Sequence, residues 1–199
     1  MENTQSKNNI FGLVLAGGKS TRMGTDKGKI IYHNRPHREH IYKMLESLCD
    51  KVFMSLRVDQ VENVNSNFNF IIDQNEYRGP FNGILSAHAK YPIHAWLIVA
   101  TDLPLLKKSD IVTLIESRNP NKIATAFATK ESKLPEPLVA IWEPSALKKS
   151  SEYLAQGKGT CPRKFLINSD IELVYPENDE VLMNANTLED LQLAKAKLQ

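Results

Sequence analysis

Short apolar runs alternate with longer amphipathic stretches along most of the chain. Apolar runs bounded by turn-forming residues are typical of strands, whereas apolar positions three and four residues apart predict helices. Strands are expected over Ile10–Ala16, Val52–Leu56, Phe68–Ile72, Trp96–Ala100, Ile123–Ala126, Leu138–Ile141 and Ile171–Val174. Helices are expected over Arg38–Cys49, Asn82–Lys90, Lys108–Ser117, Pro144–Leu154, Cys161–Ile167 and Leu188–Leu198. This alternation predicts βαβ units and an α/β fold with a mainly parallel sheet.

Length and charge narrow the class of protein. The chain has 199 residues and a net charge of +2, with acids and bases interspersed. A chain of this size fits one domain that buries roughly 70% of its unfolded surface. A single domain over residues 1–199 is therefore expected. The balanced charge argues against a nucleic acid or an anionic membrane as partner.

Cysteine, histidine and hydropathy patterns point to a cytoplasmic protein without a zinc site. Cys49 and Cys161 lie far apart, and the polar N-terminus lacks a secretory signal. No apolar run approaches the roughly 20 residues that a membrane span needs. The histidines are scattered along the sequence and are not interpreted as a metal cluster; His40 is expected to be a surface or packing residue.

The stretch from Leu15 to Lys27, LAGGKSTRMGTDK, places glycines and cations directly behind an apolar strand. Glycine lets backbone N–H groups approach an anion without a Cβ in the way. A tight turn is the alternative interpretation of Gly17 and Gly18. Arg22 and Lys27 favour a cradle for a triphosphate, because neutral residues would suffice in a turn.

Two familiar phosphate motifs do not fit this loop. A Walker A loop needs a glycine five residues before Gly18, and position 13 is Leu. A dinucleotide-binding fingerprint needs Gly-x-Gly-x-x-Gly, which is absent here. The loop therefore belongs to a different class of nucleotide site.

The loop resembles the L-A-G-G-x-S-x-R-M-G-x-D-K signature of the nucleotidyltransferases typified by molybdenum cofactor guanylyltransferase. This resemblance implies a three-layer αβα sandwich with a Rossmann-like sheet, of the nucleotide-diphospho-sugar transferase type. It also implies a nucleotide-binding half over about residues 8–107 and an acceptor-binding half over about 108–199. The residues implied to bind the nucleotide here are Leu15, Ala16, Gly17, Gly18 and Lys27, with Arg22 and Lys27 acting on the phosphates.

Asp102 follows the apolar strand Trp96–Ala100 and precedes Pro104. Ligands bind beyond the carboxyl ends of strands in open α/β sheets, so Ala16 and Asp102 converge on one crevice if their strands are parallel. A carboxylate there suits Mg²⁺, with Mn²⁺ as a substitute; the alternative is that Asp102 caps a turn. The segment resembles the family's C-D-x-P metal motif with Thr101 in place of Cys, which implies that Asp102 is catalytic and holds the metal.

Asp73 and the glycines that follow it form a third candidate element. The stretch from Asp73 to Ile84 resembles the family's D-x-x-x-x-x-G-P-x-x-G-I-L segment. That resemblance implies that Asp73, Gly79 and Gly83 wall the nucleotide base. Without it, Gly79-Pro80 would be interpreted as a turn that leads into a helix.

The C-terminal third resembles the family's acceptor side. Pro137–Trp142 is similar to its P-L-x-A-L-x strand, and Met183–Leu191 to its N-x-N-T-P-E-D-L segment, with Leu188 in place of proline. Arg163, Asn184 and Asn186 are accordingly candidate acceptor residues. The sequence offers Asn186 or Thr187 as the cap of the last helix. A cap is the equal alternative for Asn186, which is the better capping candidate of the two asparagines. A solvated charge is the equal alternative for Arg163.

One departure concerns specificity. The family often has Asn-x-Asn after its second strand, whereas this chain has Ser55-Leu56-Arg57. The departure puts the contacts to guanine or ribose in doubt.

The resemblance implies transfer of GMP from GTP to the phosphate of molybdopterin with release of pyrophosphate. It also implies transient contact with other proteins of molybdenum cofactor biosynthesis. One alternative is the same fold acting on CTP or on another phosphorylated acceptor, such as a sugar phosphate. A non-catalytic nucleotide-binding regulatory domain is disfavoured because both Lys27 and Asp102 are present. The sequence leaves open the acceptor, the base and the oligomeric state.

Overall fold

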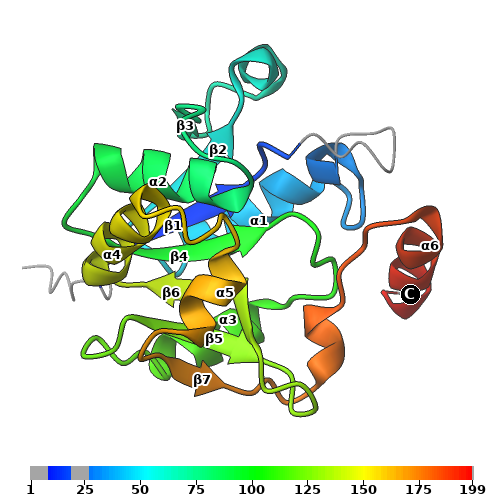
Figure 1. The fold of residues 1–199 in the computed structure, drawn as a ribbon. Coiled ribbons are helices and arrows are strands. Elements are labelled where there is room, and N and C mark those ends of the chain that lie inside the picture. The colour runs from blue at the N-terminus through cyan, green and yellow to red at the C-terminus, as the bar shows by residue number, and fades with distance from the viewer. Residues whose placement is uncertain (1–8, 19–26, 199) are drawn as a thin grey trace, which may run out of the picture.

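A seven-stranded sheet runs through the computed structural model, which describes residues 9–18 and 27–198 (Figure 1). The strands are β1 (Ile10–Leu15), β2 (Lys51–Leu56), β3 (Phe70–Ile72), β4 (Ala95–Ala100), β5 (Ala124–Ala128), β6 (Pro135–Trp142) and β7 (Glu172–Val174). Their order is β3-β2-β1-β4-β6-β5-β7. Only β6 runs antiparallel to its neighbours, β4 and β5, so the expected mainly parallel sheet is confirmed.

Helices cover both faces of this sheet. They are α1 (His37–Glu46), α2 (Pro80–Lys90), α3 (Lys108–Glu116), α4 (Pro144–Ala155) and α5 (Pro162–Ile167), whereas α6 (Leu188–Lys197) lies beside the sheet (Figure 1). Buried residues of α1 and α3 pack with one set of strand residues, and those of α2, α4 and α5 pack with the alternate set. Because successive strand residues point to opposite faces, two apolar cores form and the predicted three layers result. None of the described helices is long and apolar enough to span a membrane.

The expected strands and helices are all present, with ends that differ by a few residues. The largest differences are at the start of β6, which was expected over Leu138–Ile141 and begins at Pro135, and at the end of α1, which was expected at Cys49 and lies at Glu46. Proline argues against a central strand because it cannot donate a ladder hydrogen bond. Here the β5 pairing shifts register between Ala126 and Ala128, and Ala128 still pairs with Pro135. Short 3₁₀ helices were not expected: η1 (Lys27–Lys29), η2 (Val58–Asn63) and η3 (Asp179–Leu182).

The structure decides which of the two candidate residues caps the last helix. Thr187, not Asn186, is the N-cap of α6: its side chain accepts a hydrogen bond from the Asp190 N–H at 3.1 Å. Asp190 in turn accepts from the N–H groups of Asn186 and Thr187, both at 2.9 Å. This capping box satisfies the first turn of the helix and leaves the Asn186 side chain for another contact.

The order of strands creates a switch point between β1 and β4. From β1 the chain moves outward to β2 and β3, and then returns to place β4 on the other side of β1. Both pairings of β1 are parallel, and Leu15 aligns with Ala100 at the carboxyl ends. Ligand crevices form at such points because the loops that follow the two strands diverge.

Three histidines, His33, His37 and His40, pack together at the start of α1. The rings of His33 and His40 stack with centroids 4.0 Å apart, and His37 is buried against Tyr32 with centroids 5.0 Å apart. His40 is thus a packing residue, as expected. Burial and the neighbouring His40 and His33 lower the pKa of His37 to about 3. Burial, His33 and Arg35 lower the pKa of His40 to about 4. His37 and His40 are therefore neutral at pH 7.

The buried neutral His37 predicts acid destabilisation. The unfolded chain binds a proton at His37 below about pH 6.5, but the folded protein does so only near pH 3, so the free energy of unfolding falls as the pH drops through this window. The contribution of His37 is roughly 3 kcal/mol between pH 7 and pH 4. Urea denaturation of wild type and His37→Leu at both pH values isolates this effect from the carboxylates that both proteins share. An equal pH dependence in the two proteins would contradict the assignment.

Candidate functional site

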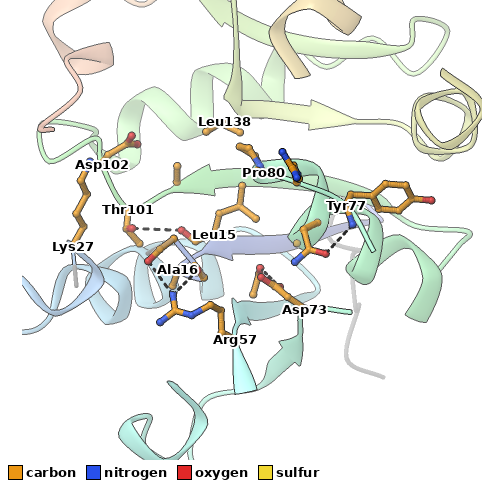
Figure 2. Close-up of a pocket in the computed structure, with 18 of the residues that line it drawn as sticks. Leu15, Ala16, Lys27, Arg57, Asp73, Tyr77, Pro80, Thr101, Asp102 and Leu138 are labelled. Atoms are coloured by element: carbon orange, nitrogen blue, oxygen red, sulfur yellow. Dashed lines mark hydrogen bonds between the residues drawn. The ribbon is translucent and has the colours of Figure 1, made fainter. Parts of the chain in front are cut away.

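The candidate site is a cavity of about 530 Å³ at the carboxyl ends of β1 and β4 (Figure 2). The expected convergence of Ala16 and Asp102 is confirmed, since both line this cavity. The expected nucleotide residues line it together: Leu15, Ala16, Gly17, Gly18, Lys27, Asp73, Gly79, Gly83 and Asp102. Arg22 lies outside the described residues.

Gly17 and Gly18 occupy different surroundings. A Cβ on Gly17 would lie 2.5 Å from Oδ2 of Asp73, whereas a Cβ on Gly18 would meet no described atom within 4 Å. Gly17 is therefore required by close packing against a protein carboxylate. Gly18 faces open space, so its role is not to relieve a clash within the described part of the fold.

Asp73 anchors the junction of β2, β3 and α2. Its buried carboxylate accepts a hydrogen bond from Ser55 Oγ at 2.6 Å. Burial raises the pKa of Asp73, while the Ser55 hydrogen bond and the nearby Arg57 oppose this rise. A Cβ on Gly83 would lie 2.2 Å from the same Ser55 Oγ. Asp73, Ser55, Gly17 and Gly83 thus form one closely packed unit beneath the cavity.

The entrance to α2 makes a second wall. Gly79 is the N-cap and has a φ of 68°, a conformation that glycine adopts without strain, and Pro80 follows in the first turn. Asn82 Oδ1 accepts a hydrogen bond from the Tyr77 N–H at 3.5 Å. The expected turn into a helix is therefore present, and Tyr77 and Pro80 line the cavity (Figure 2).

The side chains of Lys27 and Asp102 point toward each other at one side of the cavity (Figure 2). Burial raises the pKa of Asp102, and the Lys27 ammonium opposes this rise. Asp102 Oδ1 is buried and has no hydrogen-bond partner among the described residues. A buried carboxylate oxygen without a donor is costly, so it favours a bound cation.

The C-terminal segment joins this corner of the site. The Ala185 N–H donates to the Asp102 carbonyl at 2.8 Å, and Lys27 Nζ donates to Asn186 Oδ1. Asn186 therefore positions the loop lysine, a contact between residues 159 positions apart that the sequence could not indicate. Asn184 is half-buried nearby but does not line the cavity.

Arg163 has protein partners in the structure. Its Nη2 donates to Glu136 at 2.5 Å and its Nε donates to the Pro135 carbonyl at 3.1 Å. Arg163 does not line the cavity. It fastens α5 to β6, and its role toward an acceptor stays a prediction.

Sequence reasoning did not single out Ser55 and Arg57 as site residues, although both line the cavity. Ser55 lies inside an apolar strand and Arg57 resembles an exposed charge after it, so neither carries a local signal. The only sequence signal was their departure from the family's Asn-x-Asn pattern.

Comparisons with known proteins agree with this geometry. Residues 12–172 match the family model described as the MobA-like NTP transferase domain. The chain is 37% identical over 187 residues to a molybdenum cofactor biosynthesis bifunctional protein of Synechocystis; the match covers 93% of this chain and 53% of that relative, so the chain spans about half of its length. A molybdenum cofactor guanylyltransferase of Shewanella halifaxensis is 25% identical, with 92% of both chains covered.

A solved structure shares the fold. The crystal structure of molybdopterin-guanine dinucleotide biosynthesis protein A from Archaeoglobus fulgidus has a TM-score of 0.76 and 21% identity, covering 94% of this chain and 97% of that one. The nucleotidyltransferase sandwich expected from the sequence is thereby confirmed. From the family match over most of its length, we conclude that this chain belongs to the MobA-like NTP transferase domain family.

Proposed function

We propose that this chain transfers GMP from GTP to the phosphate of molybdopterin, releases pyrophosphate and forms a dinucleotide. The observation that carries the proposal is the presence of Gly17, Gly18, Lys27 and Asp102 in one cavity at the switch point of the sheet. The names of the relatives, which include molybdenum cofactor guanylyltransferase, support this choice of nucleotide and acceptor.

In this proposal Lys27 and the backbone N–H groups of Gly17 and Gly18 hold the β- and γ-phosphates, together with Arg22 of the same loop. Gly17 and Gly18 follow the carboxyl end of β1, which is paired on both sides, so their N–H groups are held by an interior strand of the sheet. Fixed donors stabilise the charge that grows on the pyrophosphate as it leaves, without having to reorganise.

Asp102 is the residue that would hold Mg²⁺ or Mn²⁺. Its unpartnered Oδ1 fits a hard cation, which takes one or two protein carboxylates and completes its shell with phosphate oxygens and water. When bound, the cation would act as a Lewis acid and neutralise developing negative charge. No other acidic group is needed, because the phosphate oxygens of the substrate supply the remaining ligands.

In this proposal the two substrates occupy different sides of the site. Asp73 and the segment from Gly79 to Gly83 lie on the side of β2 and α2, where they would receive the ribose and base. Asn186 contacts Lys27, and Ala185, between Asn184 and Asn186 in the chain, contacts Asp102. The acceptor would approach this segment, with both asparagines as its candidate contacts. The acceptor phosphate is already ionised near neutral pH, so the chain needs no general base and acts by positioning and electrostatics.

The nucleotide and the two charged residues can be tested together. Wild type with Mg²⁺ and molybdopterin should release pyrophosphate from GTP, but not from CTP, ATP or UTP. Lys27→Ala and Asp102→Asn should each lower turnover at least about 100-fold, because each removes a charge that stabilises the transition state. Thermal unfolding serves as the control and should change little.

The outcomes separate the parts of this proposal. Release from CTP would retain the mechanism and change the specificity. Normal turnover by Asp102→Asn would show that the metal assignment is wrong. Binding of nucleotides without release from any of them would favour a regulatory domain.

The two glycines of the loop should respond differently to a methyl group. Gly17→Ala places a Cβ against Asp73 and should lower the free energy of unfolding by about 1–3 kcal/mol. Gly18→Ala places its methyl group within 4 Å of no described atom, so stability should hold while the affinity for GTP falls. Urea denaturation and calorimetric titration with GTP measure the two effects. Equal stability loss in both variants would contradict the packing argument.

A further inference from the structure

The residues around η2 hold the glycine loop by its carbonyl oxygens. Arg57 Nη1 donates to the carbonyls of Gly17 at 2.6 Å and Gly18 at 3.1 Å. Gln60 Nε2 donates to the Ala16 carbonyl at 2.9 Å. We call Arg57 and Gln60 the carbonyl clamp. Together the two side chains bind the carbonyl groups of three consecutive residues, Ala16, Gly17 and Gly18.

Further hydrogen bonds hold the side chains of the clamp in place. Asp59 accepts from Arg57 Nε at 3.0 Å and from Arg57 Nη2 at 2.8 Å, so both edges of the guanidinium are engaged. Gln60 is buried, and its Oε1 accepts from the Arg57 N–H at 3.0 Å. The planar guanidinium is therefore held in one orientation, which a flexible ammonium group would not be.

Holding the carbonyls decides where the N–H groups point. The C=O and N–H groups of a trans peptide lie in one plane and point in opposite directions. The Ala16 carbonyl shares its peptide with the Gly17 N–H, and the Gly17 carbonyl shares its peptide with the Gly18 N–H. Because the clamp binds both carbonyls, both N–H groups point away from it. Neither has an acceptor among the described residues.

We propose that Arg57 and Gln60 are positioning residues that preset the Gly17 and Gly18 N–H groups to receive the phosphates of the nucleotide. This inference rests on the proposed function. It assigns Arg57 a role through the loop rather than on the substrate, since its Nη1 is engaged by the loop carbonyls and its other edge by Asp59. A preset loop spares the nucleotide the entropy cost of ordering it.

The test compares a triphosphate with a monophosphate of the same base. Loss of the clamp should weaken binding of GTP, whose β- and γ-phosphates reach the loop, more than binding of GMP. Arg57→Ala should weaken GTP binding about tenfold and GMP binding less than about threefold, as measured by calorimetry. The KM for GTP should rise while kcat at saturating GTP changes little. Arg57→Lys should recover less than half of the lost binding free energy, because it restores the charge without the planar fork.

Variants of neighbouring residues provide matched controls. Val58 is 65% exposed between Arg57 and Asp59, and Val58→Ala should bind GTP like wild type. Gln60→Leu removes the second half of the clamp and should also weaken GTP more than GMP. Circular dichroism and thermal unfolding identify any variant that fails to fold. If Arg57→Ala fails to fold, the GTP affinity of Arg57→Lys is compared with that of Val58→Ala instead.

Each result bears on the clamp or on the proposed function. Wild-type affinity of Arg57→Ala for GTP would overturn the clamp, as would an equal loss for GTP and GMP. If wild type binds CTP instead of GTP, the base assignment fails and the clamp is tested with CTP against CMP. If wild type binds GTP and the variants weaken it as expected, but no pyrophosphate is released, only the proposed reaction fails. Absence of binding to every nucleotide would overturn both.

Discussion

The parallel pairing of β1 with β4 is the constraint on which the site depends. The chain reverses its direction of travel across the sheet between these strands, so the loops after them separate and leave a cavity. The pairing aligns Leu15 with Ala100, which brings the glycine loop beside Thr101 and Asp102. The apolar cores on both faces fix this register, because a slip of one residue would move buried side chains to the opposite face.

The polar groups around the cavity divide into those with protein partners and those without. Asp73 is paired with Ser55, and the carbonyls of the glycine loop are held by Arg57 and Gln60. Asp102 Oδ1 and the N–H groups of Gly17 and Gly18 have no partner among the described residues. The paired groups lie beneath the loop and support it. The unpartnered carboxylate oxygen suits a cation, and the unpartnered N–H groups suit phosphate oxygens. Binding of both is the chemistry expected of an NTP transferase domain.

The sequence was most informative where residues that are close in the chain act together. The strand and glycine run from Ile10 to Gly18, the Gly79-Pro80 helix entrance and the Asp102 strand end carry local signals of turn chemistry and periodicity. The structure confirms the elements at these positions. Ends were less well predicted, as at Pro135, because register with a neighbouring strand decides where a strand stops.

What the sequence determined by itself was the order of elements, the mainly parallel sheet and the motifs at the carboxyl ends of strands, since these follow from local propensity and spacing. Only the tertiary structure decided the contacts between distant segments. It brought Asn186 to Lys27 and left the cap of α6 to Thr187. It placed Arg57 so that its guanidinium donates to the carbonyl of Gly17, 40 residues earlier in the chain. Such contacts depend on where whole elements pack, and no local pattern of residue types encodes that packing.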